Sequence, residues 1–383
     1  MTDRRACIVG VGETEYSRAS GRTEVTLAVE AVLAALEDGG IAPAELDGIL
    51  PAGPSVRSEE IISSLGLPNV HFTATVQMGG ATPVGCLGLA AAAIEAGLAN
   101  TVAVYAGRNG RSGAKVSARV VGLPNQRLRA QLEHPYGWST PAQHYAMFCR
   151  RHMHEHGTTK DQLGLVSVTM RAHAQLNERA MMFGRPMTLD EYHASPMIAD
   201  PYQMFDCCLE TDGGAAFVLT TADRARDLTD LPVRVGGYGE GHPESPDDPV
   251  SRKDPLRIGL SYAAPPAFAR AGITPADVDA AMIYDCFTFE LLHQLEEAGF
   301  CDRGASGEFV ANQGIGLDGA LPVNTHGGLM SEGHMLGINH VNEAVRQLRG
   351  QCDGRQLADP RWIAVTGWGD FGDGTIALLT SEM

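Results

Sequence analysis

The chain has 383 residues, of which 44% are hydrophobic and 20% are charged, so its composition is that of a compact globular protein and excludes a disordered chain or a fibrous repeat. It has 29 Lys and Arg residues and 46 Asp and Glu residues, and the resulting net charge of −17 repels nucleic acid phosphates and anionic lipids. We therefore expect neither a nucleic acid nor a membrane as a partner.

The eight cysteines are spread along the chain without a Cys-x-x-Cys pair, so we expect no zinc ribbon, no disulfide framework and no metal site in this chain. The first residues lead directly into an apolar strand at 6–9 without the hydrophobic segment of a signal peptide. The longest apolar run, at 87–94, is far shorter than the ~20 residues that span a membrane. The sequence therefore predicts a cytoplasmic protein.

Strands and helices alternate from the start of the chain. An apolar strand at 6–10 precedes an amphipathic helix that ends at Gly39-Gly40, and a short turn at 41–47 leads into a strand at 48–50. The turn recurs at 273–279, an offset of 232, again between a helix and a strand. A helix at 80–97 followed by a strand at 101–105 likewise recurs as a helix at 333–350 followed by a strand at 362–366.

These two correspondences predict an internal duplication in a layered α/β fold, packed about a pseudo-twofold axis. We place the first half at 1–230 and the second at 231–383. A long excursion at about 107–210 interrupts the first half. It contains a capping box from Thr159 to Gln162 before a further helix, and we expect the excursion to cover a site.

Three motifs in the first 210 residues have both a functional and a structural interpretation. Gly10-x-Gly12 follows a strand, but Glu15 stands where a dinucleotide-binding loop needs its third glycine. The run His152-x-His154-x-His156 is able to ligate a metal, although residues two apart do not share a helix face, so we favour a helix end closed by Gly157. Cys207 and Cys208 point in opposite directions in an extended segment, and we favour buried small side chains there.

Two later segments contain residues that are suited to catalysis. Tyr284-Asp285-Cys286-Phe287-Thr288 ends a strand and opens a helix, where α/β proteins commonly place polar reactive groups, although a structural role for Tyr284 stays open. In the segment 324–334, glycines at 327, 328 and 333 allow close backbone approach to a ligand, and a helix from about 335 directs its N–H dipoles towards His334. A histidine there is able to act as acid or base, or to be structural.

At these segments the sequence resembles the thiolase superfamily, particularly its sterol carrier protein x and lipid-transfer-protein branch, from residue 4 to 381. The phrases that match are CIVGVGETEYSR, the alanine-rich helix ending in AIEAG, YDCFT and NTHGGLMSEGHMLG. The resemblance implies two duplicated halves in an αβαβα arrangement with a loop insertion, an acyl-coenzyme A ligand and a homodimer core.

The chain departs from thiolases at both catalytic cysteines. Counting back from Gly97 puts the nucleophile position at Gly80, and the glycine-rich loop at 365–370, which holds the second thiolase cysteine, has none here. Cys86 lies about 9 Å along the helix and is a poor substitute. This pattern resembles the steroid side-chain-cleaving aldolases, which lack the thiol pair and use a tyrosine at the position of Tyr284. His334 matches the thiolase Gly-His-Pro histidine, where those aldolases have a second tyrosine.

This resemblance implies a retro-aldol cleavage of a β-hydroxyacyl-coenzyme A thioester without an acyl-enzyme. The expected substrate is a 17-hydroxy steroid C22-coenzyme A, which yields a 17-ketosteroid and propionyl-coenzyme A. Tyr284 takes the hydroxyl proton, with Asp285 in the neighbouring polar network and His326 as the expected relay. His334 or backbone N–H groups stabilise and reprotonate the enolate.

The same resemblance implies binding sites and partners. Arg108 and Arg111 begin a run of six basic residues, with Lys115, Arg119, Arg127 and Arg129, that either binds the coenzyme A phosphates or is a solvated loop. Gly327 and Gly328 are expected to let the backbone approach the ligand. We expect no cofactor beyond coenzyme A in the substrate, and a homodimer that joins a small OB-fold and zinc-ribbon protein in a heterotetramer, with zinc only in that partner.

Two alternatives remain open at this point. One is a thiolase or acyltransferase that recruits Cys286 or Cys86 as its nucleophile. The other is a non-catalytic subunit that binds an acyl-coenzyme A or a lipid.

Overall fold

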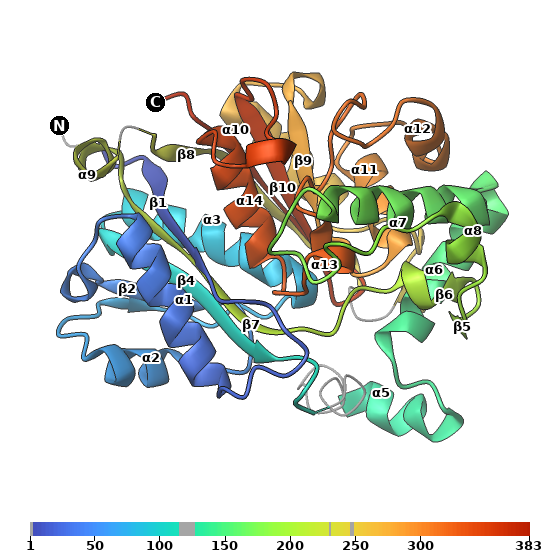
Figure 1. Ribbon diagram of the computed structural model, residues 1–383, viewed down its shortest axis with the longest axis horizontal. Helices are drawn as coiled ribbons and strands as arrows, with labels where there is room; N and C mark the ends of the chain where they lie inside the picture. Colours follow the sequence, from blue (N-terminus) through green and yellow to red (C-terminus); the bar gives the residue numbers. More distant parts are fainter. Residues whose placement is uncertain (1–2, 115–126, 230, 246–248) are drawn as a thin grey trace.

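The computed structural model describes residues 3–114, 127–229, 231–245 and 249–383 (Figure 1). Its strands are β1 (Ala6–Glu13), β2 (Gly48–Pro51), β3 (Phe72–Thr73), β4 (Thr101–Asn109), β5 (Met197–Ala199), β6 (Tyr202–Gln203), β7 (Asp212–Thr221), β8 (Val233–Gly241), β9 (Ala280–Ile283), β10 (Trp362–Gly369) and β11 (Asp373–Thr380). Its helices are α1 (Glu24–Asp38), α2 (Ser58–Leu65), α3 (Thr82–Glu95), α5 (Arg127–Leu132), α6 (Pro141–His156), α7 (Lys160–Ala174), α8 (Leu189–His193), α9 (Ala222–Leu228), α10 (Leu260–Ala271), α11 (Thr288–Glu297), α12 (Ser306–Asn312), α13 (Gly328–Ser331) and α14 (Ile338–Leu348).

The large sheet is symmetrical in its strand order, β3-β2-β4-β7-β1-β8-β11-β10-β9. The series β1, β7, β4, β2 on one side of the centre is repeated as β8, β11, β10, β9 on the other. At the centre, β1 and β8 pair over two positions, Cys7 with Arg234 and Ile8 with Val233. The 3₁₀ turns Pro43–Glu45 and Pro275–Asp277 precede β2 and β9, which confirms the recurring turn expected from the sequence. We propose that the halves meet between α9 and β8.

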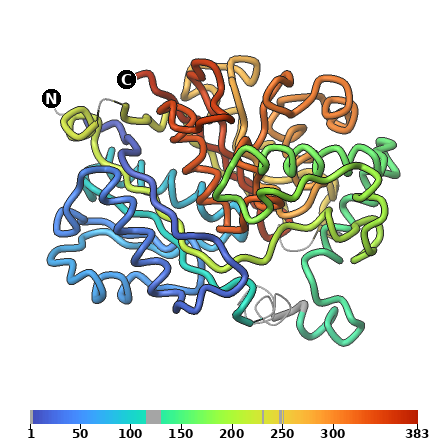
Figure 2. Tube along the Cα trace, viewed as in Figure 1, coloured from blue at the N-terminus to red at the C-terminus, as the bar shows by residue number. Residues whose placement is uncertain are grey.

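Helices cover both faces of the sheet, because side chains on both faces of its strands are buried. Apolar residues of α3 and α14 share one core with inward strand residues such as Ile8, Phe217 and Val365. The opposite faces of β1, β4 and β7 pack on α1 and α2, and α10 and α11 pack on the second half of the sheet. This gives the layered α/β arrangement, and both termini lie on one side of the molecule (Figure 2).

The first glycine motif serves packing in this fold. Gly10 and Gly12 lie within β1, where a Cβ atom would come 1.9 Å from the carbonyl oxygen of Ala35 and 2.3 Å from that of Ala31. The two glycines therefore allow α1 to lie against β1, and they form no phosphate-binding turn.

The excursion between β4 and β7 contributes α6, α7 and α8 over the second half of the molecule, coloured green in Figure 1. Helix α7 packs on α11, α12 and α13. The hydroxyl of Thr159 accepts from the backbone N–H of Gln162 at its N-terminus, as the capping box predicts. Helix α6 ends at His156 with Gly157 in the left-handed conformation, which confirms the expected helix end. In the described residues, no helix is both long and hydrophobic enough to cross a bilayer.

Candidate active site

Tyr284 follows the carboxyl end of β9, which lies parallel to β10, and its side chain is buried. Its ring packs against the backbone of Gly80. A Cβ atom at Gly80 would lie 2.4 Å from two ring carbons of Tyr284 and 2.5 Å from the carbonyl oxygen of Trp368. Only glycine leaves room for the ring, so the position at which thiolases are expected to hold their nucleophile cannot bear a side chain here.

A hydrogen-bonded series of three side chains, Arg108, His334 and Tyr284, ends at the Tyr284 hydroxyl. Nε2 of His334 lies 3.2 Å from the Tyr284 oxygen, and a guanidinium nitrogen of Arg108 contacts Nδ1 of His334. Arg108 lies near the end of β4 and is buried. Because a guanidinium only donates, Nδ1 accepts, and a neutral His334 ring has its proton on Nε2, where it donates to the Tyr284 oxygen. The backbone of His334 is held by a 2.9 Å bond from its N–H to the Thr211 hydroxyl.

Two opposing effects act on the Tyr284 hydroxyl. Burial raises its pKa well above the usual range, and the nearby Cys286 and Glu290 add to this shift. The resting phenol is therefore neutral. The Arg108 cation, relayed through the His334 N–H, favours the phenolate. The arrangement is suited to moving a proton at this oxygen when a substrate is bound.

The thiols of Cys208 and Cys286 lie beside His334 in this hydrogen-bonded series of side chains. Sγ of Cys286 is 3.3 Å from Sγ of Cys208, and the backbone N–H of Cys208 donates to the carbonyl of Cys286 at 2.9 Å. Contact with Cys208 and burial raise the pKa of Cys286 well above its ordinary value. Burial also raises the pKa of Cys86, to about 12. Because the thiolate is the reactive form and a raised pKa disfavours it, neither Cys286 nor Cys86 is an effective nucleophile.

Glu290, in the first turn of α11, is a buried carboxyl group in the same region. Burial raises its pKa well above the usual range, and the nearby Cys286 contributes to the shift. Its protonated form is therefore favoured, and it is a potential proton source. Sequence reasoning missed Glu290 because helix periodicity does not distinguish a buried acid from a solvated one.

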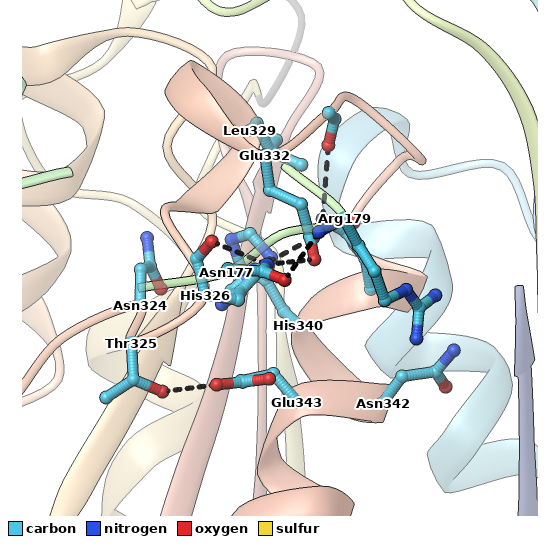
Figure 3. A network of polar contacts seen from close by, with 12 residues as sticks. Asn177, Arg179, Asn324, Thr325, His326, Leu329, Glu332, His340, Asn342 and Glu343 are labelled. Carbon is cyan, nitrogen blue, oxygen red and sulfur yellow. Dashed lines mark hydrogen bonds and ion pairs between the residues drawn. The ribbon is translucent and has the colours of Figure 1, made fainter. Parts of the chain in front are cut away.

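His326 and Asp285 belong to a second buried network, part of which is drawn in Figure 3. Nε2 of His326 lies 3.2 Å from Nδ1 of His340, and Nε2 of His340 lies 3.1 Å from Oδ1 of Asp285. That carboxylate oxygen also accepts the backbone N–H of Leu329 at 2.8 Å. Burial and the neighbouring His340 cause a low pKa for His326. Among the described residues no hydrogen bond joins His326 to Tyr284, and the imidazole that contacts the Tyr284 hydroxyl is that of His334.

The residues expected to bind coenzyme A are dispersed. Arg108 is engaged with His334, whereas Arg111 is exposed, with its guanidinium 3.9 Å from the Glu210 carboxylate. Gly327 and Gly328 are buried at the start of α13, and a Cβ atom on Gly328 would lie 2.0 Å from the Asp285 carboxylate. Lys115 and Arg119 lie outside the described residues, as do the side chains of Arg127 and Arg129.

Comparisons with known proteins identify the family. A family model described as "Thiolase C-terminal domain-like" matches residues 245–381. A "17-hydroxy-3-oxo-4-pregnene-20-carboxyl-CoA lyase" of Mycobacterium tuberculosis is 39% identical over 91% of this chain and 93% of its own. The chain belongs to the thiolase superfamily.

Further similarities relate this member of the thiolase superfamily to aldolases. A "Steroid side-chain-cleaving aldolase" of Thermomonospora curvata is 38% identical over 90% of each chain. The solved structure of "Ltp2-ChsH2(DUF35) aldolase" covers 100% of this chain and 99% of its own, with a TM-score of 0.93 and 35% identity. These relatives confirm the thiolase fold and the resemblance to steroid side-chain-cleaving aldolases that the sequence indicated.

Proposed function

We propose that the protein cleaves a β-hydroxyacyl-coenzyme A thioester by a retro-aldol reaction, with a 17-hydroxy steroid C22-coenzyme A as substrate and a 17-ketosteroid and propionyl-coenzyme A as products. The observation that carries this proposal is the packing of the Tyr284 ring on Gly80, which leaves no thiol at the expected nucleophile position. The names of the two similar lyases support the choice of a steroid thioester.

The first step removes the proton from the β-hydroxyl group of the substrate. In the fraction of molecules whose Tyr284 has already released its own proton to solvent, the phenolate takes this proton. Until the transfer, the N–H of His334 and the charge of Arg108 stabilise the phenolate oxygen. The O–H electron pair then forms the ketone, and the Cα–Cβ bond breaks with its electrons moving into the thioester enolate. No bond between substrate and protein is formed.

The second step returns a proton to the α-carbon of the enolate, which releases propionyl-coenzyme A. Tyr284 holds the proton that it received, and the buried acid Glu290 is a second source in the same region. One proton leaves the hydroxyl and one reaches carbon, so the cycle is balanced without a cofactor. Asp285 and His326 support the loop that positions His334 and do not contact the reacting atoms.

The phosphates of coenzyme A require a cationic group at the protein surface. Arg111 is the described member of the basic run whose side chain is free to reach solvent, and we assign it to a coenzyme A phosphate. The aldolase named "Ltp2-ChsH2(DUF35)" pairs two components in its name, which supports a small accessory protein for this chain. A homodimer core, a heterotetramer, zinc in that accessory protein and a cytoplasmic location stay predictions.

The test is to incubate the purified chain, with and without the accessory protein, with a 17-hydroxy steroid C22-coenzyme A thioester. Mass spectrometry follows the ketone, propionyl-coenzyme A and the intact protein. We expect both products in equal amounts and an unchanged protein mass during turnover. An acyl adduct on the protein, or turnover of a 3-ketoacyl thioester alone, would contradict the proposal.

A further inference from the structure

A second cluster of potential ligand atoms lies between the inserted segment and the second half of the fold. It consists of His152 on α6 and His293 and Glu296 on α11, which are one helical turn apart on the same face. All three side chains are fully buried. None of them belongs to the Arg108, His334 and Tyr284 chain, so the proposed reaction does not account for this cluster.

The spacing of the three groups suits a small cation. Nε2 of His152 lies 3.1 Å from each carboxylate oxygen of Glu296, and Nδ1 of His293 lies 4.0 Å from Oε2. The ligand atoms all lie within 4.8 Å of one another. Nitrogen and oxygen ligands bind Zn²⁺ at about 2.0–2.2 Å in a tetrahedron, which places them about 3.3 Å apart. Only small side-chain shifts are needed to reach that geometry.

The orientation of the His293 ring places one of its nitrogens opposite the Glu296 carboxylate. Its Nε2 lies 2.5 Å from the carbonyl oxygen of Leu256, and a carbonyl only accepts, so the ring proton is on Nε2. Nδ1 therefore presents a lone pair towards the Glu296 carboxylate, and within the described part of the chain it has no hydrogen-bond partner. A lone pair that faces a carboxylate in a dry interior is unfavourable unless a cation lies between them.

Each proposed ligand side chain is also hydrogen-bonded to a second group that fixes its orientation. The second ring nitrogen of each histidine is engaged, His293 with the Leu256 carbonyl and His152 with the Thr158 hydroxyl at 2.8 Å. The Thr158 hydroxyl either donates or accepts, so it suits both tautomers of His152. One oxygen of Glu296 receives the N–H and the hydroxyl of Ser306. Such outer contacts fix the tautomer and direction of ligating side chains.

We propose that His152, His293 and Glu296 bind one divalent first-row transition metal, of which Zn²⁺ is the expected ion, and that this ion fastens the inserted helix α6 to α11. Two imidazoles and one carboxylate match the preference of Zn²⁺, whereas Mg²⁺ and Ca²⁺ prefer oxygen ligands alone. The second carboxylate oxygen of Glu296, which also lies 3.1 Å from Nε2 of His152, is placed to take the fourth position. The role is structural, because the ligands are closed off from solvent and separate from the Tyr284 chain.

This assignment divides the histidine run of α6. The side chain of His154 is exposed and lines a surface cavity with Trp138, so it cannot join the cluster. The ring of His156 lies 4.7 Å from that of His152 and covers it. The sequence favoured a helix end for this run, and the helix does end there. The proposed site takes only His152 from this run, and its other two ligands come from α11, which spacing along α6 does not reveal.

The test uses the purified full-length chain without its accessory protein, stripped with a chelator and then incubated with ZnCl₂. After gel filtration, elemental analysis is expected to find one zinc per chain, and zinc is expected to raise the melting temperature by several degrees. Cobalt(II) is expected to give visible absorption bands of a nitrogen and oxygen site without thiolate charge-transfer bands.

The variant His293→Gln is expected to lose the bound zinc and its thermal shift, whereas His154→Gln and Cys208→Ser keep both. Retention of stoichiometric zinc by His293→Gln, or absence of zinc from the wild-type chain after gel filtration, overturns the proposal. A thiolate band in the wild-type cobalt spectrum also overturns it, and this measurement does not depend on the folding of any variant.

Discussion

Gly80 and Tyr284 are matched to each other, because a Cβ atom at position 80 would lie 2.4 Å from two carbons of the tyrosine ring. Real side chains do not approach so closely, so either a nucleophilic side chain at 80 or the phenol ring occupies this space, and not both. In the proposed mechanism, this exchange replaces acyl-enzyme chemistry with acid–base chemistry in a thiolase fold.

Restoring a cysteine by Gly80→Cys is expected to displace the Tyr284 ring and to lower the rate of thioester cleavage at least about 100-fold, since misplacement by 1 Å has an effect of this size. The cleavage rate is measured as the steady-state release of propionyl-coenzyme A. Cys86→Ala, a substitution within α3, the helix that begins two residues after Gly80, is the matched control and is expected to keep the parent rate. Full activity of Gly80→Cys would contradict the packing argument.

Tyr284→Phe keeps the ring that fills the space beside Gly80 and removes only the hydroxyl that faces His334. We expect kcat to fall by about 10² to 10⁴, the range for loss of a general base, with little change in melting temperature. Tyr202→Phe is the control, because its hydroxyl bonds the Tyr145 carbonyl at 3.3 Å outside the catalytic chain. Equal rates for both variants would remove Tyr284 from the mechanism.

Arg108→Gln removes the cation behind His334. A cation favours the phenolate, so its loss is expected to raise the pKa of Tyr284 further and to shift the rising limb of the kcat profile to higher pH. The readout is kcat and KM as a function of pH. The exposed Arg111 provides the comparison: Arg111→Gln is expected to raise KM and to leave the pH limb in place. If Arg108→Gln changes only KM and leaves the pH profile in place, Arg108 binds coenzyme A and does not act on Tyr284.

The double variant Cys86→Ala, Cys286→Ala is expected to keep the parent rate within a factor of about three, because burial holds the pKa values of both thiols above their ordinary range. Intact-protein mass spectrometry under turnover is expected to find no adduct in either protein. Loss of activity together with loss of a trapped acyl group would support a thiol mechanism instead.

Glu332 makes a testable contribution to pH-dependent stability. Burial raises its pKa to about 8, and the neighbouring Glu13 adds to the shift, whereas Arg179 opposes it. The folded state therefore binds this proton more tightly than the unfolded state, so the stabilisation is complete below about pH 4.5 and is lost as the pH rises through 8. Glu332→Gln is expected to flatten the fall in urea midpoint between pH 5.5 and 8.5.

Glu343 is the control for that experiment. Its pKa is lowered to about 2, in spite of burial, by its hydrogen bonds to the Arg355 guanidinium. It is ionised in both states across the same pH window, so Glu343→Gln is expected to lower stability without changing the slope. A slope unchanged in Glu332→Gln would show that another group titrates.

Local signals in the sequence predicted much of the fold. The repeated turn before β2 and β9, the capping box at Thr159 and the position of Tyr284 after a strand all depend on residues a few positions apart. The helix after His334 begins at Ile338 rather than at about 335, because Leu336 and Gly337 have positive φ angles. Spacing alone does not anticipate such a backbone reversal.

The contacts of the candidate site were harder to predict, because they join distant residues. Arg108 and His334 are 226 positions apart, and only the pairing of β4 within the folded sheet brings the arginine to the histidine. The sequence grouped Arg108 with nearby basic residues by charge density. Similarly, His326 and His334 lie in one glycine-rich loop, and the order of residues does not reveal which of them faces Tyr284.

The repeated strand order has a consequence for how the candidate site is divided between the two halves. Position 284 after β9 corresponds to Ala52 after β2, so the counterpart of the reactive phenol is a methyl group in the other copy. In the proposed mechanism the second half supplies the hydroxyl and the imidazole, and the first half supplies the arginine and the glycine. Severed into separate polypeptides, neither repeat retains a complete set of reactive groups.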